Sequence, residues 1–343
     1  MGLIKKPLLL LMIDFQKLAD IITTNKTFLI TTHVNPDADA IGSEIAFHKM
    51  LGMLGKKSRI INHSTTPYNL EFLDTEDVIE KFDESRHKNL FNSSNVLVAL
   101  DFNRSDRLVN MQKGFTESKQ LKICIDHHLD SEDFVSHQFI GNDYAATGHI
   151  LYDFIKQTKI VGINKEIAIP IYAAIMTDTG SFRFERTTAS IHRIVADLLE
   201  KGVNPTEVYD LLYDESKLSK IKLLGKCLSS LKLIADNRLG YMVLTQKDFS
   251  DLNAIESDTE NFVNHILSVE GVKLGMLFIE LKNGFKVSFR SKESIPVNKL
   301  AGEFGGGGHL NAAGARFRDS EMNSVIPKIL EEAENYYNKY SEG

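Results

Sequence analysis

Aspartate and histidine side chains gather at four places in the first half of this sequence, each time after an apolar run. The stretch "TTHVNPDADAIGSE" (residues 31–44) follows "FLI" and contains His33, Asp37 and Asp39. The other groups are Asp101 at the end of "VLVALD", Asp126, His127 and His128 at the end of "LKICIDHH", and Asp178 after "IYAAIMT". Carboxylates gathered at one spot repel one another, and burying them unpaired is costly. A positive counter-charge is therefore expected among them.

Divalent cations are the counter-charge that these residue types favour. Oxygen-rich sites with one or two imidazoles suit Mn²⁺ or Mg²⁺, and imidazole favours Mn²⁺. Neither Cys124 nor Cys227 is placed to make a thiolate zinc site. Two ions roughly 3.5–4 Å apart, sharing a carboxylate, use such a ligand set better than one ion does. Such a pair activates a water molecule and holds a phosphate, so the inferred reaction is metal-assisted phosphoester hydrolysis.

Each of these signals has an ordinary structural alternative. A lone Asp101 at a strand end would more often form a turn or cap a helix, and a lone His33 would more often be structural. The letters "DHH" alone are a weak match. The metal site is favoured because the same placement recurs in four separate segments.

The elements that must position these groups read as alternating strands and helices. Strands are expected at residues 26–33, 58–62, 95–101, 121–126 and 181–185, and helices at 13–24, 41–55, 147–158 and 164–176. The nearly continuous apolar runs at 95–101 and 121–126 suit strands buried on both faces of a parallel sheet. The carboxyl ends of such strands share one edge, where ligands bind. We therefore expect an open, mainly parallel α/β sheet flanked by helices.

The second half of the chain has a different texture. Residues 188–230 look helical throughout, and the later part of this stretch is interpreted as a connector. Two hairpins follow, "LKLIADNRLGYMVLT" and "VKLGMLFIELKNGFKVSFRSK", with Asn283-Gly284 as the expected tight turn of the second. These features predict a smaller α+β domain.

Composition sets limits on what the chain does. With 343 residues there is room for two domains, and 43% hydrophobic with 25% charged residues is typical of a soluble globular protein. Two distant cysteines argue against a disulfide framework and fit a reducing cytoplasm. A net charge of −6 argues against a broad electrostatic grip on long nucleic acid.

Membrane and secretory readings are not favoured. The opening "MGLIKKPLLLLMID" imitates a secretory signal, but its apolar run is short and Asp14 interrupts it. It is interpreted as a tail or a lead into the first helix. No segment of the sequence is long and apolar enough to span a membrane.

Five motifs in order carry a family resemblance: "HVNPDADAIGS", "ALD", "DHH", "TDTGSFRF" and "GGGGHLNAAG". Together they resemble the DHH phosphoesterases with a DHH-associated C-terminal domain, most of all the bacterial oligoribonucleases (nanoRNases) that are also phosphatases on 3′-phosphoadenosine 5′-phosphate. The resemblance implies a catalytic metal-binding domain at 1–190, a helical connector at 191–230 and a substrate-binding domain at 231–343. Ala38, where glycine is common, and Thr32, where aspartate often stands, depart from the pattern without removing a ligand.

The resemblance also implies an activity. It is that of a cytoplasmic hydrolase with two Mn²⁺ ions, for which Mg²⁺ can substitute. The enzyme would cut short RNA oligonucleotides to 5′-mononucleotides and convert the adenosine bisphosphate to AMP. Short oligonucleotides and nucleotide bisphosphates would be its partners, without long nucleic acid or membrane; a homodimer is compatible with the sequence.

Residue roles follow from the resemblance. His33, Asp37 and Asp101 would bind one metal, while Asp39, Asp101, His127 and Asp178 would bind the other, with Asp101 bridging. His128 would face the substrate phosphate or leaving group, and Asp126 would orient a neighbouring histidine.

In the C-terminal domain, Gly306, Gly307, Gly308 and His309 would hold a phosphate, helped by the N-terminus of a following helix. Arg290, in "VSFRSK", would add a bidentate contact. A cleft between the domains would then limit substrate length. Without the family match, a bare glycine run is more often a flexible loop and an isolated Arg an exposed strand residue.

Three other functions share parts of this pattern. A pyrophosphatase or polyphosphatase would keep the same metal ligands. A non-hydrolytic nucleotide sensor would be favoured by a missing ligand, and all expected ligands are present. A nuclease for longer single strands would be expected to have extra domains and a more basic face. Among aromatic residues that could stack on a base near the second domain's motifs, Phe289 and Phe304 are the candidates.

Overall fold

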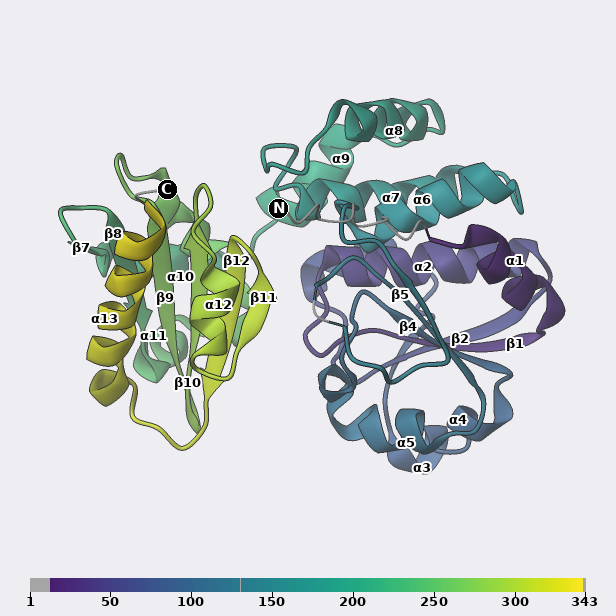
Figure 1. Cartoon of the computed structure of the whole chain (residues 1–343), viewed down its shortest axis with the longest axis horizontal. Coiled ribbons are helices and arrows are strands. Elements are labelled where there is room, and N and C mark those ends of the chain that lie inside the picture. The colour runs from purple at the N-terminus through teal and green to yellow at the C-terminus, as the bar shows by residue number, and fades with distance from the viewer. Residues whose placement is uncertain (1–12, 130, 342–343) are drawn as a thin grey trace, which may run out of the picture. The chain divides into compact units, whose positions relative to one another are not determined.

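The computed structural model describes residues 13–129 and 131–341, and it divides into two compact units, Met1–Glu215 and Ser216–Gly343 (Figure 1). Of the segment interpreted as an N-terminal lead, residues 1–12 lie outside the described residues. The helical stretch 191–230 is divided between the two units, since the boundary falls at residue 215.

A parallel sheet organises the first unit. Its six strands lie in the order β3-β2-β1-β4-β5-β6, and every neighbouring pair is parallel. The strands are β1 (Thr27–Thr31), β2 (Lys57–Asn62), β3 (Ile79–Lys81), β4 (Val96–Leu100), β5 (Leu121–Asp126) and β6 (His137–Ile140). The strand order reverses between β1 and β4: the chain runs outward from β1 to β2 and β3, and from β4 it runs the other way to β5 and β6. In doubly wound sheets, ligands bind at such a reversal point. The predicted open parallel sheet is confirmed.

Helices cover both faces of this sheet (Figure 1). On one face lie α1 (Phe15–Thr24), α2 (Ala38–Met53), α6 (Thr147–Thr158) and α7 (Lys165–Asp178). On the other lie α3 (Glu84–His87), α4 (Leu90–Ser93) and α5 (Gln112–Glu117). Alternate residues of one strand serve the two sides: Ile30 of β1 packs in the larger core and Leu29 in the smaller. Burial on both faces explains the continuous apolar runs of the central strands.

The close packing of α2 against α7 helps to position the candidate site that is described below. A Cβ on Gly42 of α2 would collide with the main-chain carbonyl of Pro170 in α7, so glycine permits this close approach. The first unit ends with α8 (Ala189–Glu200), α9 (Pro205–Tyr209) and a π-turn at Asp210–Asp214; 3₁₀ turns occupy Tyr68–Leu73 and Ser105–Met111.

The predicted short strand "SFRFE" is wrong. Residues 179–183 form a turn, with positive φ at Gly180 (58°), Ser181 (57°) and Phe182 (64°), values that a strand does not allow.

The second unit is built on a mixed sheet in the order β11-β12-β10-β9-β8-β7. Its strands are β7 (Lys232–Ile234), β8 (Leu239–Leu244), β9 (Leu274–Leu281), β10 (Gly284–Ser291), β11 (Gly307–His309) and β12 (Ala312–Phe317). Its helices are α10 (Leu218–Ser229), α11 (Gln246–Leu252), α12 (Val297–Gly302) and α13 (Met322–Ser341), with 3₁₀ turns at Glu256–Thr259 and Phe262–Ser268. Both hairpins predicted from the sequence are present.

Two details of this unit differ from the expectations. The tight turn between β9 and β10 is Lys282–Asn283, one residue earlier than predicted, because Leu281 pairs with Gly284. Gly284 instead opens β10 with φ 103°, against the carbonyl of Phe317, where a Cβ would collide. The glycine-rich segment does not lead into a helix: β11 turns back and pairs with β12. The expected helix dipole behind a bound phosphate is therefore wrong.

Cys124 and Cys227 are both buried and unbridged, as expected. In the ranges 13–129 and 131–341, no helix combines the length and apolar character needed to cross a bilayer.

Candidate metal centre

The four acidic groups of the sequence converge at the carboxyl edge of the first sheet. His33, Asp37 and Asp39 follow β1, Asp101 follows β4, and Asp126, His127 and His128 end or follow β5. Asp178 arrives differently, as the last residue of helix α7. Nε2 of His127 lies 3.5 Å from a carboxylate oxygen of Asp39, 3.6 Å from one of Asp101 and 3.2 Å from one of Asp178. Three distant strand ends and one helix end thus meet at a single imidazole.

Asp101 is the common member of the ligand groups. His33, Asp37 and Asp101 each offer a ligand atom within 4.8 Å of the others, and so do Asp39, Asp101 and His127. Nε2 of His33 is 3.4 Å from Oδ2 of Asp101. Asp101 adopts φ 64°, a left-handed conformation that aspartate tolerates better than most residues. Two triplets sharing one carboxylate match the chemistry of a pair of cations with a bridging ligand.

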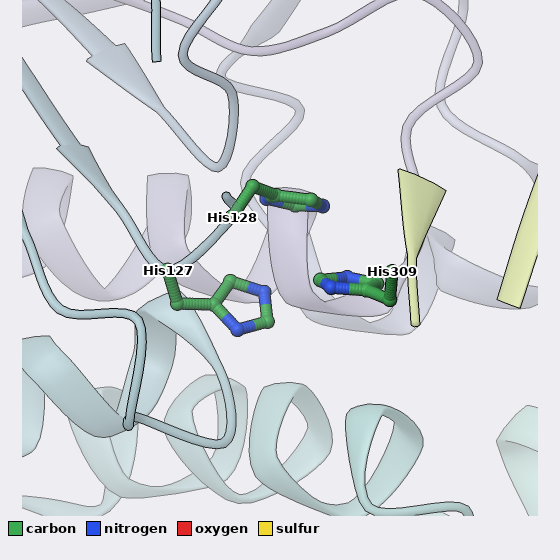
Figure 2. Close-up of side chains that lie close together, drawn as sticks. All are labelled: His127, His128 and His309. Atoms are coloured by element: carbon green, nitrogen blue, oxygen red, sulfur yellow. The ribbon is translucent and has the colours of Figure 1, made fainter. Parts of the chain in front are cut away.

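Main-chain carbonyls orient the two histidines of these triplets. Nδ1 of His33 lies 3.0 Å from the carbonyl of Val34, and Nδ1 of His127 lies 3.4 Å from that of Tyr144. A proton on Nδ1 serves these contacts and directs Nε2 to the carboxylates, as in metal-bound histidines generally. Figure 2 shows His127 and His128 after β5, with ring centres 4.6 Å apart, and also labels His309 of the second unit.

Burial makes the centre electrostatically unstable without cations. Asp39, Asp101 and His127 are at most 2% exposed. Burial, and then the charges of Asp39 and Asp37, raise the pKa of Asp101 well above its usual range. Burial also raises the pKa of Asp178, to about 6. Burial acts to lower the pKa of His127, but its contacts with Asp178 and Asp39 outweigh burial and raise the pKa to about 9.

These directions reflect the burial of the carboxyl groups and the excess of negative charge among them. The crowded carboxylates favour protons on one another and on His127, and bound cations would take the place of these protons. The donor set of carboxylate oxygens and imidazole nitrogens fits Mn²⁺ or Mg²⁺. The residues present therefore fit divalent cations.

Asp126 and His128 form a pair beside these two triplets, and with Asp101 they make up a third group whose ligand atoms lie within 4.8 Å of one another. Nδ1 of His128 lies 2.7 Å from Oδ1 of Asp126, and Oδ2 accepts from the main-chain N–H of His128 at 3.2 Å. Burial acts to raise the pKa of Asp126, but its contacts with His128 outweigh burial and lower it. The side chain of His128 is 30% exposed, whereas that of Asp126 is fully buried. Asp126 therefore holds a solvent-accessible imidazole in a fixed orientation.

The N-terminus of α6 also serves the centre, and the sequence patterns did not point to it. The main-chain N–H groups of Thr147 and Gly148 donate to the two oxygens of Asp39, at 2.7 and 2.9 Å. The hydroxyl of Thr147 donates to Oδ1 of Asp101 at 3.0 Å. Positive dipole and donors at a helix start stabilise a buried carboxylate. The available signal was "ATGH" at the start of a predicted helix, which carries no charge to attract notice.

A buried polar chain behind the ligands was missed as well. Glu44 of α2 is fully buried, and Oε2 accepts from the side-chain amide of Asn62 at 2.8 Å. Oδ1 of Asn62 accepts in turn from the main-chain N–H of Thr32 at 3.1 Å. Burial raises the pKa of Glu44 to about 8, so this carboxyl group is neutral at pH 7. This series of hydrogen bonds ends at Thr32, one residue before His33, and stabilises the end of β1.

The second unit places its candidate residues in one row across the sheet. Ala312 of β12 pairs with Arg290 of β10 on one side and with His309 of β11 on the other. Residues in register on neighbouring strands project from the same face. Arg290 and His309, both half-buried, therefore flank a small alanine. A short side chain between a cation and an imidazole leaves room for an anionic ligand.

Comparison with known proteins gives two family matches. The model of the DHH family, N-terminal domain, matches residues 27–175, and that of the DHHA1 domain matches residues 239–339. These ranges contain the residues of the acidic centre, except Asp178, and the Arg290–His309 row.

Similar proteins cover nearly the whole chain. The bifunctional oligoribonuclease and PAP phosphatase NrnA of Thermus thermophilus is 33% identical over 88% of this chain and 87% of its own length. NrnA of Bacillus subtilis is 25% identical over 84% of this chain and 88% of its own. A crystal structure of an exopolyphosphatase-related protein from Bacteroides fragilis superposes with a TM-score of 0.88 at 30% identity, covering 96% of this chain and 97% of that one.

Proposed function

This chain belongs to the DHH family, and we propose that it is a divalent-metal-dependent phosphoesterase that hydrolyses short RNA oligonucleotides to 5′-mononucleotides and 3′-phosphoadenosine 5′-phosphate to AMP. The observation that carries this proposal is the pair of ligand triplets sharing Asp101 at the sheet edge. The substrates come from the names of the relatives, which match this chain along most of its length.

We assign His33, Asp37 and Asp101 to one cation and Asp39, Asp101, His127 and Asp178 to the other. Mn²⁺ is the proposed ion because two imidazoles accompany the carboxylates, with Mg²⁺ as a substitute. When bound, the cations supply Lewis-acid activation of water and of the phosphate. Asp101, at the end of β4, would contact both ions, and the hydroxyl of Thr147, which donates to its carboxylate, would help to orient it.

Proton transfer to the leaving group falls to His128. Asp126 holds Nδ1 of this histidine at 2.7 Å, so Nε2 is the nitrogen that exchanges a proton with the leaving oxygen. A 30% exposed imidazole is accessible to a substrate, unlike the buried His127. General acid catalysis of this kind typically contributes 10²–10⁴-fold to the rate.

Substrate binding is the role proposed for the second unit. Arg290 and His309 present a guanidinium and an imidazole on the same face of the sheet, on either side of Ala312. Gly306, Gly307 and Gly308 lie beside them, on or next to β11. Such an arrangement suits a terminal phosphate or sugar of a short substrate.

A panel of substrates tests the function. With Mn²⁺ supplied, initial rates would be compared on a 5′-phosphorylated diadenylate, a longer RNA, 3′-phosphoadenosine 5′-phosphate and pyrophosphate, with a chelator control. We expect the diadenylate and the adenosine bisphosphate to be hydrolysed fastest and the chelator to abolish all turnover.

The same panel weighs the second candidate, a pyrophosphatase or polyphosphatase, which the likeness to the exopolyphosphatase-related protein favours. Faster hydrolysis of pyrophosphate would replace the proposed substrates and keep the metal centre. Full turnover in the presence of the chelator would refute the metal centre itself.

A further inference from the structure

Phe184 is an exposed aromatic ring on the turn that follows a proposed metal ligand. Its side chain is 47% exposed. Among the large hydrophobic residues that are exposed in the described part of the chain, the only aromatic ones are Phe184 and Tyr209. Two other aromatic residues were named from the sequence as candidates for stacking on a base. Phe289 is completely buried, and Phe304 packs on Phe317 with ring centres 5.8 Å apart.

The main chain of the turn holds the Phe184 ring in place. The N–H groups of Arg183 and Phe184 both donate to the carbonyl of Thr179 at 2.9 Å, and Thr187 donates back to the carbonyl of Phe184 at 2.9 Å. The ring lies against Gly180, where a Cβ would collide with three of its atoms. One edge of the ring is thus fixed against the main chain while almost half of its surface faces solvent.

The conformation of the turn is costly. Ser181 and Phe182 have φ values of 57° and 64° directly after Gly180 at 58°. Non-glycine residues in this region cost roughly 1–3 kcal/mol each and persist where the surrounding structure imposes them, most often at binding and catalytic sites. Phe182 itself packs inward on Tyr172, with ring centres 5.9 Å apart. The strained turn therefore directs Phe182 into the core and Phe184, two residues later, toward solvent.

Both ends of the turn are tied to the acidic centre. Asp178 precedes Gly180 by two residues, at most about 7 Å along the chain. At the other end, Nη1 of Arg186 donates to the carbonyl of Tyr144 at 2.9 Å and lies 3.4 Å from Nδ1 of His127. Along the chain, Phe184 lies between these two anchors, on a turn whose two ends are held at the acidic centre.

From these contacts we infer that Phe184 is a stacking platform for a nucleobase of the substrate. The inference rests on the proposed function and deepens it, because it assigns recognition of the base to the first unit. Aromatic side chains accept any base by its flat face, which suits a hydrolase that degrades short oligonucleotides of every sequence. A pyrophosphatase or polyphosphatase has no use for such a ring.

The test compares substrates with and without bases. The full chain, loaded with Mn²⁺, would be assayed on a 5′-phosphorylated diadenylate and on the matching compound in which both adenines are replaced by hydrogen. The variants are Phe184→Ala, Phe184→Leu, which keeps bulk without aromaticity, and Phe184→Tyr, which keeps the ring. Met53→Ala is the control, since Met53 is 49% exposed and lies at the opposite end of α2 from Asp39.

We expect Phe184→Ala and Phe184→Leu to raise KM for the diadenylate by about 10-fold, with the base-free compound affected less than about twofold. Phe184→Tyr and Met53→Ala should resemble the wild type on both compounds. Equal losses on both compounds would overturn the inference, because the turn would then act through Asp178. An unchanged KM for the diadenylate would also overturn it while leaving the proposed function standing. If the wild type fails on the diadenylate and on the adenosine bisphosphate, the proposed function falls first.

Discussion

The acidic centre of the first unit is almost closed to solvent, whereas the glycine-rich hairpin of the second unit is largely open to it. Asp39, Asp101, Asp126 and His127 are at most 2% exposed. Along β11, Gly307 and Gly308 are exposed and His309 is half-buried. The first region concentrates like charges that repel one another. The second places the guanidinium of Arg290 and the imidazole of His309 on either side of Ala312.

This difference separates chemistry from recognition. Buried carboxylates gain from cations because desolvation magnifies every charge nearby. An exposed hairpin cannot hold charge so tightly, but its small residues let a ligand approach the main chain. Substitutions in the first region should therefore abolish turnover or change stability with pH, while those in the second should weaken substrate binding by smaller factors.

The largest effect is expected from Asp101→Asn. Asparagine keeps the shape and tolerates the left-handed backbone of this position, so the loss is one of charge. We expect turnover to fall by more than the 10–100-fold typical of residues one layer outside the ligands, and the bound Mn²⁺ to decrease. Rates and metal content would be measured together. Asp106→Asn, an exposed aspartate of the same segment paired with Arg104, is the control. A near-normal rate would refute the shared-ligand site.

Glu44→Gln tests the contrast between the buried and the exposed region through the pH dependence of the free energy of unfolding. The folded-state pKa of Glu44, about 8, lies above its ordinary value of 4.5, so folding favours the protonated form. Stability from this group is present below about pH 4.5 and is lost as pH rises toward 8. Glutamine mimics the neutral carboxyl group and removes the loss.

We therefore expect the free energy of unfolding of Glu44→Gln, relative to the wild type, to rise between pH 5 and pH 8 by on the order of a few kcal/mol. Denaturant unfolding at several pH values measures it. The exposed Glu71→Gln should give a difference independent of pH. A flat difference for Glu44→Gln would mean that this carboxyl group is ionised in the folded protein.

Two glycines of the hairpin distinguish shape from ligand approach. Gly308 has φ 143°, and a Cβ there would collide with the carbonyl of Ala312, whereas a Cβ on Gly307 meets nothing within 4 Å. We expect Gly308→Ala to destabilise the protein by about 1–3 kcal/mol and Gly307→Ala to leave stability unchanged, as thermal unfolding would show. A rise in KM for Gly307→Ala at unchanged stability would place a ligand against this main chain; an unstable Gly307→Ala protein would contradict the structural assignment.

The smallest effect is expected from His309→Ala. Loss of one polar contact at a half-buried position should raise KM for the adenosine bisphosphate by about tenfold, equivalent to about 1.4 kcal/mol, with bound Mn²⁺ unchanged. Leu310→Ala, at the adjacent exposed residue, is the control. Loss of metal in His309→Ala would break the division between the two regions.

Sequence patterns predicted the first unit well because its signals are local. Apolar runs such as "VLVAL" and "LKICI" mark buried parallel strands, and the acids that follow them share a sheet edge by the rules of parallel topology. The glycine-rich segment was predicted poorly, since glycine fits a loop, a helix start or a hairpin equally well. Pairing with β12 decided between them, and that pairing depends on residues the glycines do not specify.

The sequence by itself determined which side chains carry charge, and that parallel strands would deliver them to one edge. Only the tertiary structure decided that α6 would direct its N–H groups at Asp39, that Asn62 would join Glu44 to β1, and that Phe184 would be exposed on the turn that follows Asp178. The physical reason is one of range. Periodicity and turn propensity act over a few residues, whereas these contacts join segments brought together when the sheet and its helices pack.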